Sequence, residues 1–132
     1  MKSSQPNTSE QPPTASASSP RDNPCLVNDP TIAALDVFAD NGISYLLPYA
    51  QFLYAEKMSN PALEKEPDAP PEKMLIHFAS ANVVVLGSGL KRLEQGIQKS
   101  ELKFVKSADR RLAATLSTHI AAVTLTLTKE NV

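Results

Sequence analysis

The sequence has little that could support covalent cross-linking or membrane insertion. Cys25 is its only cysteine, so no disulfide can form within the chain. No apolar run approaches the roughly 20 residues that span a bilayer. The first residues, MKSSQPNTSEQ, carry one lysine but no apolar stretch of a secretory signal, and they are not Arg-rich like a transit peptide. We therefore expect a soluble cytoplasmic protein without a membrane partner.

Motifs for nucleotide binding and acyl transfer are also missing. Gly87-Ser88-Gly89 precedes a helical pattern, but Arg92 stands where G-x-G-x-x-G requires its third glycine, and no G-x-x-x-x-G-K-[ST] is present. A G-x-S-x-G nucleophile turn would need glycines where Leu86 and Leu90 stand. The pattern is typical of an ordinary strand-to-helix turn. A bound anion is the alternative, because Lys91 and Arg92 in the first helical turn oppose the helix dipole.

Few residues could form a metal site or an acid–base pair. His77 and His119 are the only two histidines, and no Asp, Glu or Cys stands next to them in a ligand-like spacing. The densest acidic cluster, in residues 64–68, is expected to be solvated, whereas general acid–base chemistry needs a perturbed group in a dry pocket. We expect two structural histidines, no cofactor, no metal, no catalytic residues and no enzymatic activity.

The chain divides by composition into a polar tail and a folded part. Residues 1–24 consist mainly of Ser, Pro, Thr, Gln and Asn, with only Met1 and two alanines as apolar residues. Such a segment cannot bury enough surface to offset the entropy of ordering it. We expect a disordered Ser/Pro/Thr-rich tail over residues 1–28 and a single small domain over residues 29–132. Within that domain, the acidic, proline-rich residues 59–72 are expected to form an exposed loop.

The strongest local signal is a change of hydrophobic period within residues 74–98. Apolar residues alternate over 74–78, a turn is expected at residues 80–82, and residues 83–86 are all apolar. This predicts a strand followed by a central strand that is covered on both faces. After residues 87–89 the period becomes helical, with Ser88 as the expected cap and an apolar stripe formed by Leu90, Leu93 and Ile97.

The flanking segments supply further elements. Asp29-Pro30 and Asn41-Gly42 have the form of a helix start and stop, which predicts a short helix over residues 30–40. Residues 102–105 and 120–127 are expected to be strands, with a helical turn or loop over residues 107–116. Together these elements predict an α+β fold. We expect a small antiparallel β-sheet of about four or five strands, one main packing helix and the short N-terminal helix.

Residues 44–58 are ambiguous, because their aromatic content favours a strand while their apolar spacing also fits a helix. We favour a strand with Pro48 near its start or on a sheet edge. An edge strand could pair with another chain by β-augmentation or form a two-fold homo-oligomer, whereas a core strand would simply pack. The candidate partner-binding residues are Tyr45, Tyr49, Phe52 and Tyr54.

Charge is unevenly distributed although the formal net charge is only −1. Acids predominate up to residue 72 and bases predominate after it, which can indicate an anionic partner. The candidate nucleic-acid-binding residues are Lys91, Arg92, Lys103, Lys106, Arg110 and Arg111. Only Phe104 is available in this region for base stacking. The sequence therefore favours a non-enzymatic protein interaction or assembly module, with a nucleic-acid-associated protein as the alternative.

Overall fold

The computed structural model describes residues 23–128, and the predicted disorder of residues 1–22 falls outside them. The strands are β1 (Leu26–Asn28), β2 (Ala34–Phe38), β3 (Ser44–Pro48), β4 (Phe52–Ser59), β5 (Glu72–Phe78), β6 (Ala81–Ser88), β7 (Leu102–Lys106) and β8 (His119–Leu127). The helix α1 (Lys91–Gln98) connects β6 to β7. Short 3-10 turns occur at η2 (Tyr49–Gln51), η3 (Pro61–Glu64) and η4 (Arg110–Leu112).

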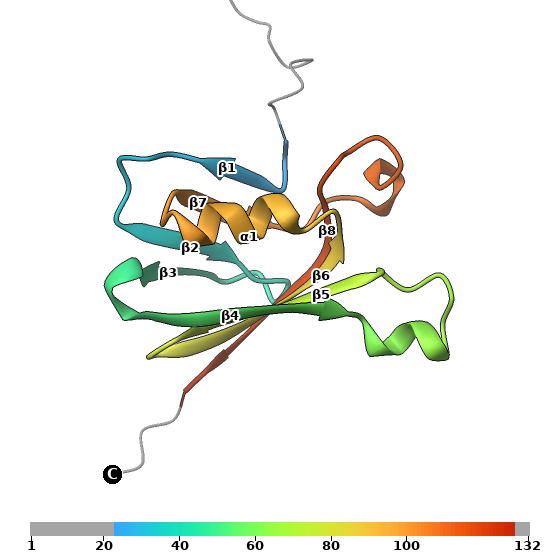
Figure 1. Ribbon diagram of the computed structural model, residues 1–132, viewed down its shortest axis with the longest axis horizontal. Helices are drawn as coiled ribbons and strands as arrows, with labels where there is room; N and C mark the ends of the chain where they lie inside the picture. Colours follow the sequence, from blue (N-terminus) through green and yellow to red (C-terminus); the bar gives the residue numbers. More distant parts are fainter. Residues whose placement is uncertain (1–22, 129–132) are drawn as a thin grey trace, which may run out of the picture.

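The strands form two four-stranded sheets, ordered β1-β7-β2-β3 (sheet 1) and β4-β5-β6-β8 (sheet 2). All neighbouring strands are antiparallel except β2 and β7, which are parallel. Figure 1 shows the two sheets as an upper and a lower layer, with α1 in front of β7 in the upper layer, sheet 1. In this view β4 is the nearest strand of sheet 2, so the free edge of that sheet faces the reader.

The core lies between the two sheets and under α1. Alternate residues of β5, Met74, Ile76 and Phe78, are fully or almost fully buried, as the period of two predicts. The apolar stripe of the helix is buried in the same core cluster at Leu93 and Ile97, and Leu90 is buried just before its first turn. Sheet 1, β6 and β8 contribute the buried residues Leu26, Leu35, Val37, Leu47, Leu102, Val105, Val83, Val85, Ile120 and Val123.

Backbone contacts at the ends of β2 and β7 join sheet 1 to β8. The Asp40 N–H donates to the Val123 carbonyl at 2.9 Å, and a carboxylate oxygen of Asp40 accepts from the Val123 N–H at 2.9 Å. The Ala108 N–H donates to the Ile120 carbonyl at 2.9 Å. These bonds satisfy polar backbone groups at the corner where the layers meet.

The helix predicted over residues 30–40 is wrong, because this segment contains the strand β2. The Asp29 carboxylate accepts from the Thr31 N–H at 2.9 Å, which is the hydrogen bond expected of a helix cap. Here it closes an Asx turn, and the chain then continues in extended form. Leu35 and Val37 are both buried, so the period that decides the structure is two.

The predicted single sheet of four or five strands is also wrong in detail, since two sheets are present, although the broad mixture of strands with one packed helix is confirmed. The difference arises in residues 44–58. These residues do form strands, but η2 interrupts them directly after Pro48 and sends β3 and β4 into different sheets. The proline has no N–H to donate to a continuing ladder, which favours a break at this point.

The remaining expectations have mixed outcomes. Strands at 102–105 and 120–127 are confirmed, and β6 is an inner strand of its sheet. However, β6 is not covered on both faces, since Val84 and Leu86 on its outer face are only half-buried. Ser88 does not cap α1 but ends β6. Among the described residues, no helix is long and apolar enough to cross a bilayer.

The folded structure begins earlier than the boundary drawn after residue 28. Cys25 and Leu26 are completely buried, and β1 pairs with β7. The Cys25 sulfur accepts from the Ile120 N–H at 3.3 Å, and burial raises the pKa of this thiol. The folded structure therefore includes residues 23–28, of which Asn23, Cys25 and Leu26 are buried.

Candidate functional site

The aromatic segment predicted to bind a partner supplies two sheet edges. β3 is the end strand of sheet 1 and β4 is the end strand of sheet 2. The candidate residues separate accordingly: Tyr45 lies on β3, Tyr49 in η2, and Phe52 and Tyr54 on β4. From the sequence we considered an edge strand in this segment, and both of its strands, β3 and β4, lie at a sheet edge.

Tyr49 and Phe52 face the interior. Their rings pack on Phe78, with centroid distances of 6.3 Å and 5.7 Å. The Tyr49 hydroxyl donates to the Leu102 carbonyl at 2.6 Å, which links η2 to the start of β7. Burial raises the pKa of Tyr49 above the ordinary value of 10.0. Both side chains therefore have a packing role that accounts for their position.

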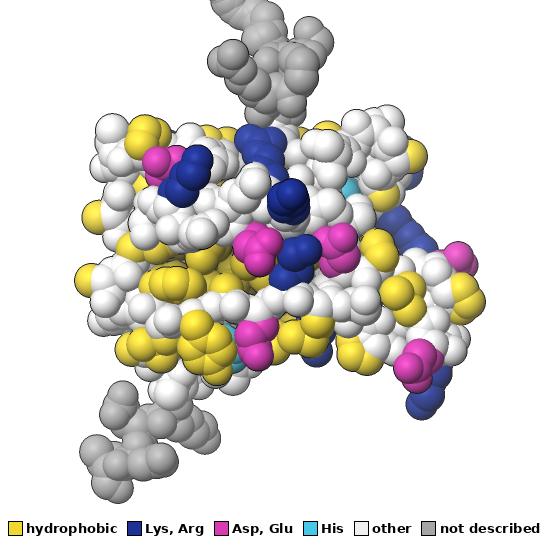
Figure 2. Space-filling view, viewed as in Figure 1, with side chains coloured by type: hydrophobic (Ala, Val, Ile, Leu, Met, Phe, Trp, Pro, Cys, Tyr) yellow, Lys and Arg dark blue, Asp and Glu magenta, His cyan; other side chains and the backbone are white. Residues whose placement is uncertain are grey.

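The exposed apolar surface of β4 is formed by Leu53 and Tyr54. They are 60% and 52% exposed, and the pairing of β4 with β5 shifts register between Phe52 and Tyr54. Figure 2 shows hydrophobic side chains gathered along β4 and in the seam between β4 and the layer above it. We call Leu53, Tyr54, Glu56 and Lys57 the β4 edge surface.

The outer face of sheet 2 carries a polar cluster beside Tyr54. The His77 ring stacks on the Tyr54 ring with centroids 4.2 Å apart. Its Nε2 lies 3.2 Å from Glu56, and its Nδ1 lies 2.8 Å from the Asn82 side-chain oxygen. These contacts hold the His77 side chain between β4 and β6, and we interpret His77 as a structural residue.

His77 and His119 do not meet. His77 pairs with Asn82 at one end of β6, and His119 pairs with Ser88 at the other. Six residues of strand separate these positions by about 20 Å. Within residues 23–128, no group of three or more His, Cys, Asp or Glu side chains is placed to hold a metal ion.

The six basic residues of the nucleic-acid alternative lie on three elements. Lys91 and Arg92 belong to α1, Lys103 and Lys106 to β7, and Arg110 and Arg111 to η4. Their surroundings differ, because Lys106 lies over the Phe38 ring at 5.7 Å whereas Arg111 pairs with Asp109 at 3.2 Å. Figure 2 shows basic and acidic side chains intermixed on the face where α1 lies.

The glycines of residues 87–89 have a steric explanation. A Cβ on Gly87 would lie 2.1 Å from the His119 carbonyl oxygen, and one on Gly89 would lie 1.9 Å from the Ser117 carbonyl oxygen. β8 and the loop before it therefore approach too closely for any side chain. The bound anion that was considered as an alternative near the helix N-terminus has an internal counterpart, because the Glu72 carboxylate accepts from the Leu90 N–H at 2.8 Å.

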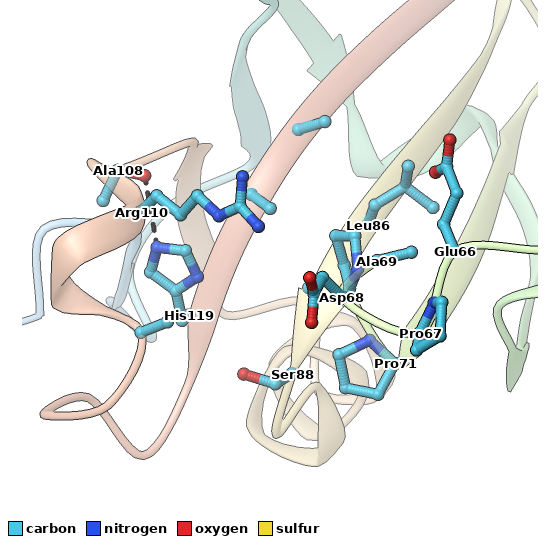
Figure 3. Close-up of a pocket in the computed structure, with 15 residues that line it drawn as sticks. Glu66, Pro67, Asp68, Ala69, Pro71, Leu86, Ser88, Ala108, Arg110 and His119 are labelled. Carbon is cyan, nitrogen blue, oxygen red and sulfur yellow. Dashed lines mark hydrogen bonds between the residues drawn. The ribbon is translucent and has the colours of Figure 1, made fainter. Parts of the chain in front are cut away.

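A cavity of about 750 Å³ lies on the other side of this turn. One wall is the proline-rich loop 66–71, the opposite wall includes Ala108, Arg110 and Ala113, and the floor is formed by residues 86–88 with 121–122. Figure 3 shows the Arg110 guanidinium and the His119 ring on one side and Asp68, Pro67 and Pro71 on the other.

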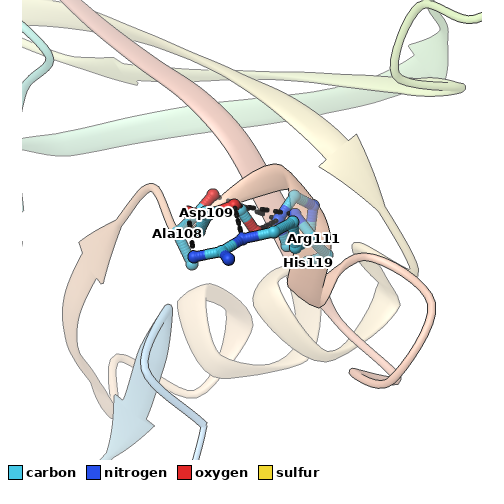
Figure 4. Close-up of polar contacts among 4 residues, drawn as sticks. All are labelled: Ala108, Asp109, Arg111 and His119. Atoms are coloured by element: carbon cyan, nitrogen blue, oxygen red, sulfur yellow. Dashed lines mark hydrogen bonds and ion pairs between the residues drawn. The ribbon is translucent and has the colours of Figure 1, made fainter.

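His119 is 3% exposed and lines this cavity. Its Nε2 lies 3.2 Å from the Ala108 carbonyl oxygen and 3.0 Å from that of Asp109, so Nε2 carries the proton and donates to them (Figure 4). The Asp109 carboxylate accepts from the backbone N–H and side chain of Arg111, and these bonds lower the pKa of Asp109. The loop that carries Arg110 is therefore tied down on both sides of that residue.

Sequence reasoning did not find this cavity. Its walls come from two loops more than thirty residues apart, and no local pattern joins them. Two features of the sequence could have indicated a cavity here. They are the length of the loop 59–72 and its combination of acidic residues with Pro67, Pro70 and Pro71.

A comparison with known protein families finds no match, and searches of curated proteins and of solved structures find none either. Function must therefore be argued from the geometry of the chain itself.

Proposed function

We propose that this chain is a non-enzymatic assembly module that associates with a second copy of itself through the β4 edge surface. The observation that carries the proposal is that β4, eight residues long, ends its sheet while presenting Leu53 and Tyr54 to solvent. An edge strand directs alternate N–H and C=O groups outward, where an added strand can satisfy them.

Symmetry limits how two β4 strands can pair. When two copies of β4 pair as antiparallel strands of one continuous sheet, the two-fold axis is perpendicular to that sheet. It passes midway between one residue and the same residue of the second copy, so that residue lies opposite itself. An axis at Glu56 or Lys57 would place like charges directly opposite, which is destabilising. An axis at Ala55 places the small alanine opposite itself and Tyr54 opposite Glu56 of the second copy, where the phenol can donate to the carboxylate. We favour this register.

The charges on β4 therefore select a register rather than prevent pairing. The contact is small and contains few large apolar side chains, so much of its interaction energy offsets the entropy of association. We expect a weak dimer whose population depends on concentration, as for other small interfaces.

Sedimentation velocity over a concentration series tests this proposal with two matched variants. Leu53→Lys places a charge on the β4 edge surface and should keep the chain monomeric. Leu46→Lys places the same charge on β3, where Leu46 is 68% exposed on the edge of the other sheet, and should leave association unchanged. A wild-type chain that stays monomeric at all concentrations, or equal loss in both variants, would overturn the proposal.

A second candidate is binding of single-stranded nucleic acid by the outer face of sheet 1. One observation favours it. The Phe38 and Phe104 rings pack edge-to-face with their centroids 5.8 Å apart, and the Lys106 ammonium lies over the Phe38 ring. Aromatic faces beside cations are the elements that stack bases and neutralise phosphates. Fluorescence anisotropy with labelled oligonucleotides should then show affinity that falls steeply with salt and weakens in Lys106→Ala. Absence of binding at low salt would eliminate this candidate.

A further inference from the structure

We propose that the cavity between residues 66–71 and η4 binds a small zwitterion with an apolar body, of the kind represented by an α-amino acid or a short peptide. Arg110 would bind its carboxylate, and Asp68 together with His119 would bind its ammonium group. This site is separate from the β4 edge surface, and the proposed assembly assigns it no role.

The first argument is the placement of opposite charges. Arg110 and Asp68 come from opposite walls and both line the cavity, with their charged ends directed toward the space between them (Figure 3). In the part of the chain that the structure describes, neither has an ion-pair partner within 4.0 Å. A ligand carrying one negative and one positive group would complete both, and the charge-assisted hydrogen bonds to Arg110 can be bidentate.

The second argument is independent of these charges and concerns His119. Its Nε2–H is used by two backbone carbonyls, so Nδ1 bears the lone pair and is an acceptor. Nδ1 faces the cavity in Figure 3, and residues 23–128 provide it with no hydrogen-bond donor. A buried acceptor without a donor is costly, and native structures rarely leave one unsatisfied. An ammonium N–H is a donor of the required kind.

The other lining residues define the rest of the ligand. Leu86, Pro67, Pro71 and Ala122 provide an apolar surface for a hydrocarbon side chain, and the Ser88 hydroxyl offers a further donor to a carboxylate. The volume of about 750 Å³ falls within the range of known ligand pockets and exceeds the needs of one amino acid, so it can admit a dipeptide.

The charges that line the cavity disfavour polyanions as ligands. Glu66 and Asp68 both line the cavity, and Arg110 is the only Lys or Arg side chain among its lining residues. A nucleotide or a sugar phosphate would face more negative than positive charge here, which is unfavourable in a partly enclosed site.

The test is an NMR titration of the full chain with L-leucine, followed by its backbone amide shifts. We expect shifts at residues 86–88 and 119–122 at millimolar ligand. N-acetyl-L-leucine, which lacks the ammonium, and L-leucinamide, which lacks the carboxylate, should each bind at least about tenfold more weakly. L-leucyl-L-leucine keeps both charges at a greater separation, and tighter binding than leucine would identify a peptide as the preferred form.

Matched variants test which residues bind the carboxylate and the ammonium group of the ligand. Arg110→Gln should abolish the leucine-induced shifts, whereas Lys91→Gln, which removes an exposed cation of α1 that does not line the cavity, should retain them. Asp68→Asn should weaken binding, and Glu64→Gln in η3 should not. All four residues are exposed, so the folded state should persist, and a thermal melt checks this.

Three results would overturn the inference. The first is no shift at about 10 mM leucine, which would mean that the cavity does not bind a zwitterion of this kind. The second is equal binding by the two capped compounds, which would exclude a zwitterion as the ligand class. The third is wild-type affinity in Arg110→Gln.

Discussion

Tyr49 offers a direct test of how η2 holds the two sheets together. Tyr49→Phe removes only the hydroxyl that donates to the Leu102 carbonyl at 2.6 Å and leaves the ring on Phe78. The change costs the net value of one hydrogen bond and leaves a carbonyl partly buried without its donor, a loss of about 1–2 kcal/mol in the free energy of unfolding. For a domain of this size, that lowers the melting temperature by about 5–10 °C.

Tyr45→Phe is the matched control, because the Tyr45 hydroxyl has only a long, exposed contact of 3.5 Å to the Asn41 amide. We expect its stability to change by less than about 0.5 kcal/mol. Urea unfolding of the three proteins measures both values. Equal stability of Tyr49→Phe and wild type would refute the reasoning that Tyr49 is structural.

The same residue predicts the alkaline limit of stability. Unfolded Tyr49 loses its proton near pH 10, whereas burial keeps the folded phenol protonated to higher pH. The folded state then binds more protons than the unfolded state, so the contribution of Tyr49 to stability is constant below about pH 10 and falls as the pH rises above it. An absorbance titration should show a late ionisation step at high pH, and Tyr49→Phe should remove that step.

Further predictions concern the core and the turn before α1. Phe78→Ala should cost about 3–5 kcal/mol in unfolding free energy, because Phe78 is 1% exposed and contacts two aromatic rings; a loss below 1 kcal/mol in urea unfolding would contradict the described core. Gly87→Ala should yield little folded protein by circular dichroism, since its Cβ would meet the His119 carbonyl at 2.1 Å; normal folding would refute that close approach. Cys25, buried with a raised pKa, should react with a thiol reagent only as denaturant unfolds the chain; fast labelling without denaturant would place it outside the core.

The elements that the sequence predicted well are those with many consistent local signals. Met74, Ile76 and Phe78 alternate on a strand that pairs on both sides, so burial and period agree. Leu93 and Ile97 repeat at helical spacing on α1, which packs over the core. In both cases the apolar pattern alone decides which face is buried.

The strand β2 could not be predicted in this way. Its flanking turns are real, since Asp29 accepts from the Thr31 N–H and Asn41 accepts from the Ile43 N–H, each at 2.9 Å. Side chains of Asp and Asn make these hydrogen bonds at turns as well as at helix ends. What decides between helix and strand is pairing with β3 and with the distant β7, which no local window contains.

The cavity was beyond sequence reasoning for a related reason. Arg110 and Asp68 each look like ordinary surface charges, and His119 looks like a structural residue of a strand. Only the fold brings the loop 66–71 opposite η4 and directs the three side chains into one space. By contrast, the edge position of residues 44–58 was considered in advance, because proline within a strand is confined to sheet edges, first residues or bulges.

The most direct test of the assembly proposal is hydrogen–deuterium exchange of the wild-type chain at low and high protein concentration. Self-association through the β4 edge predicts that amide protection in residues 54–57 increases with concentration, while protection in β3 stays the same. Exchange in residues 54–57 that does not depend on concentration, in a sample that sedimentation shows to be dimeric, would place the interface elsewhere and contradict the proposal.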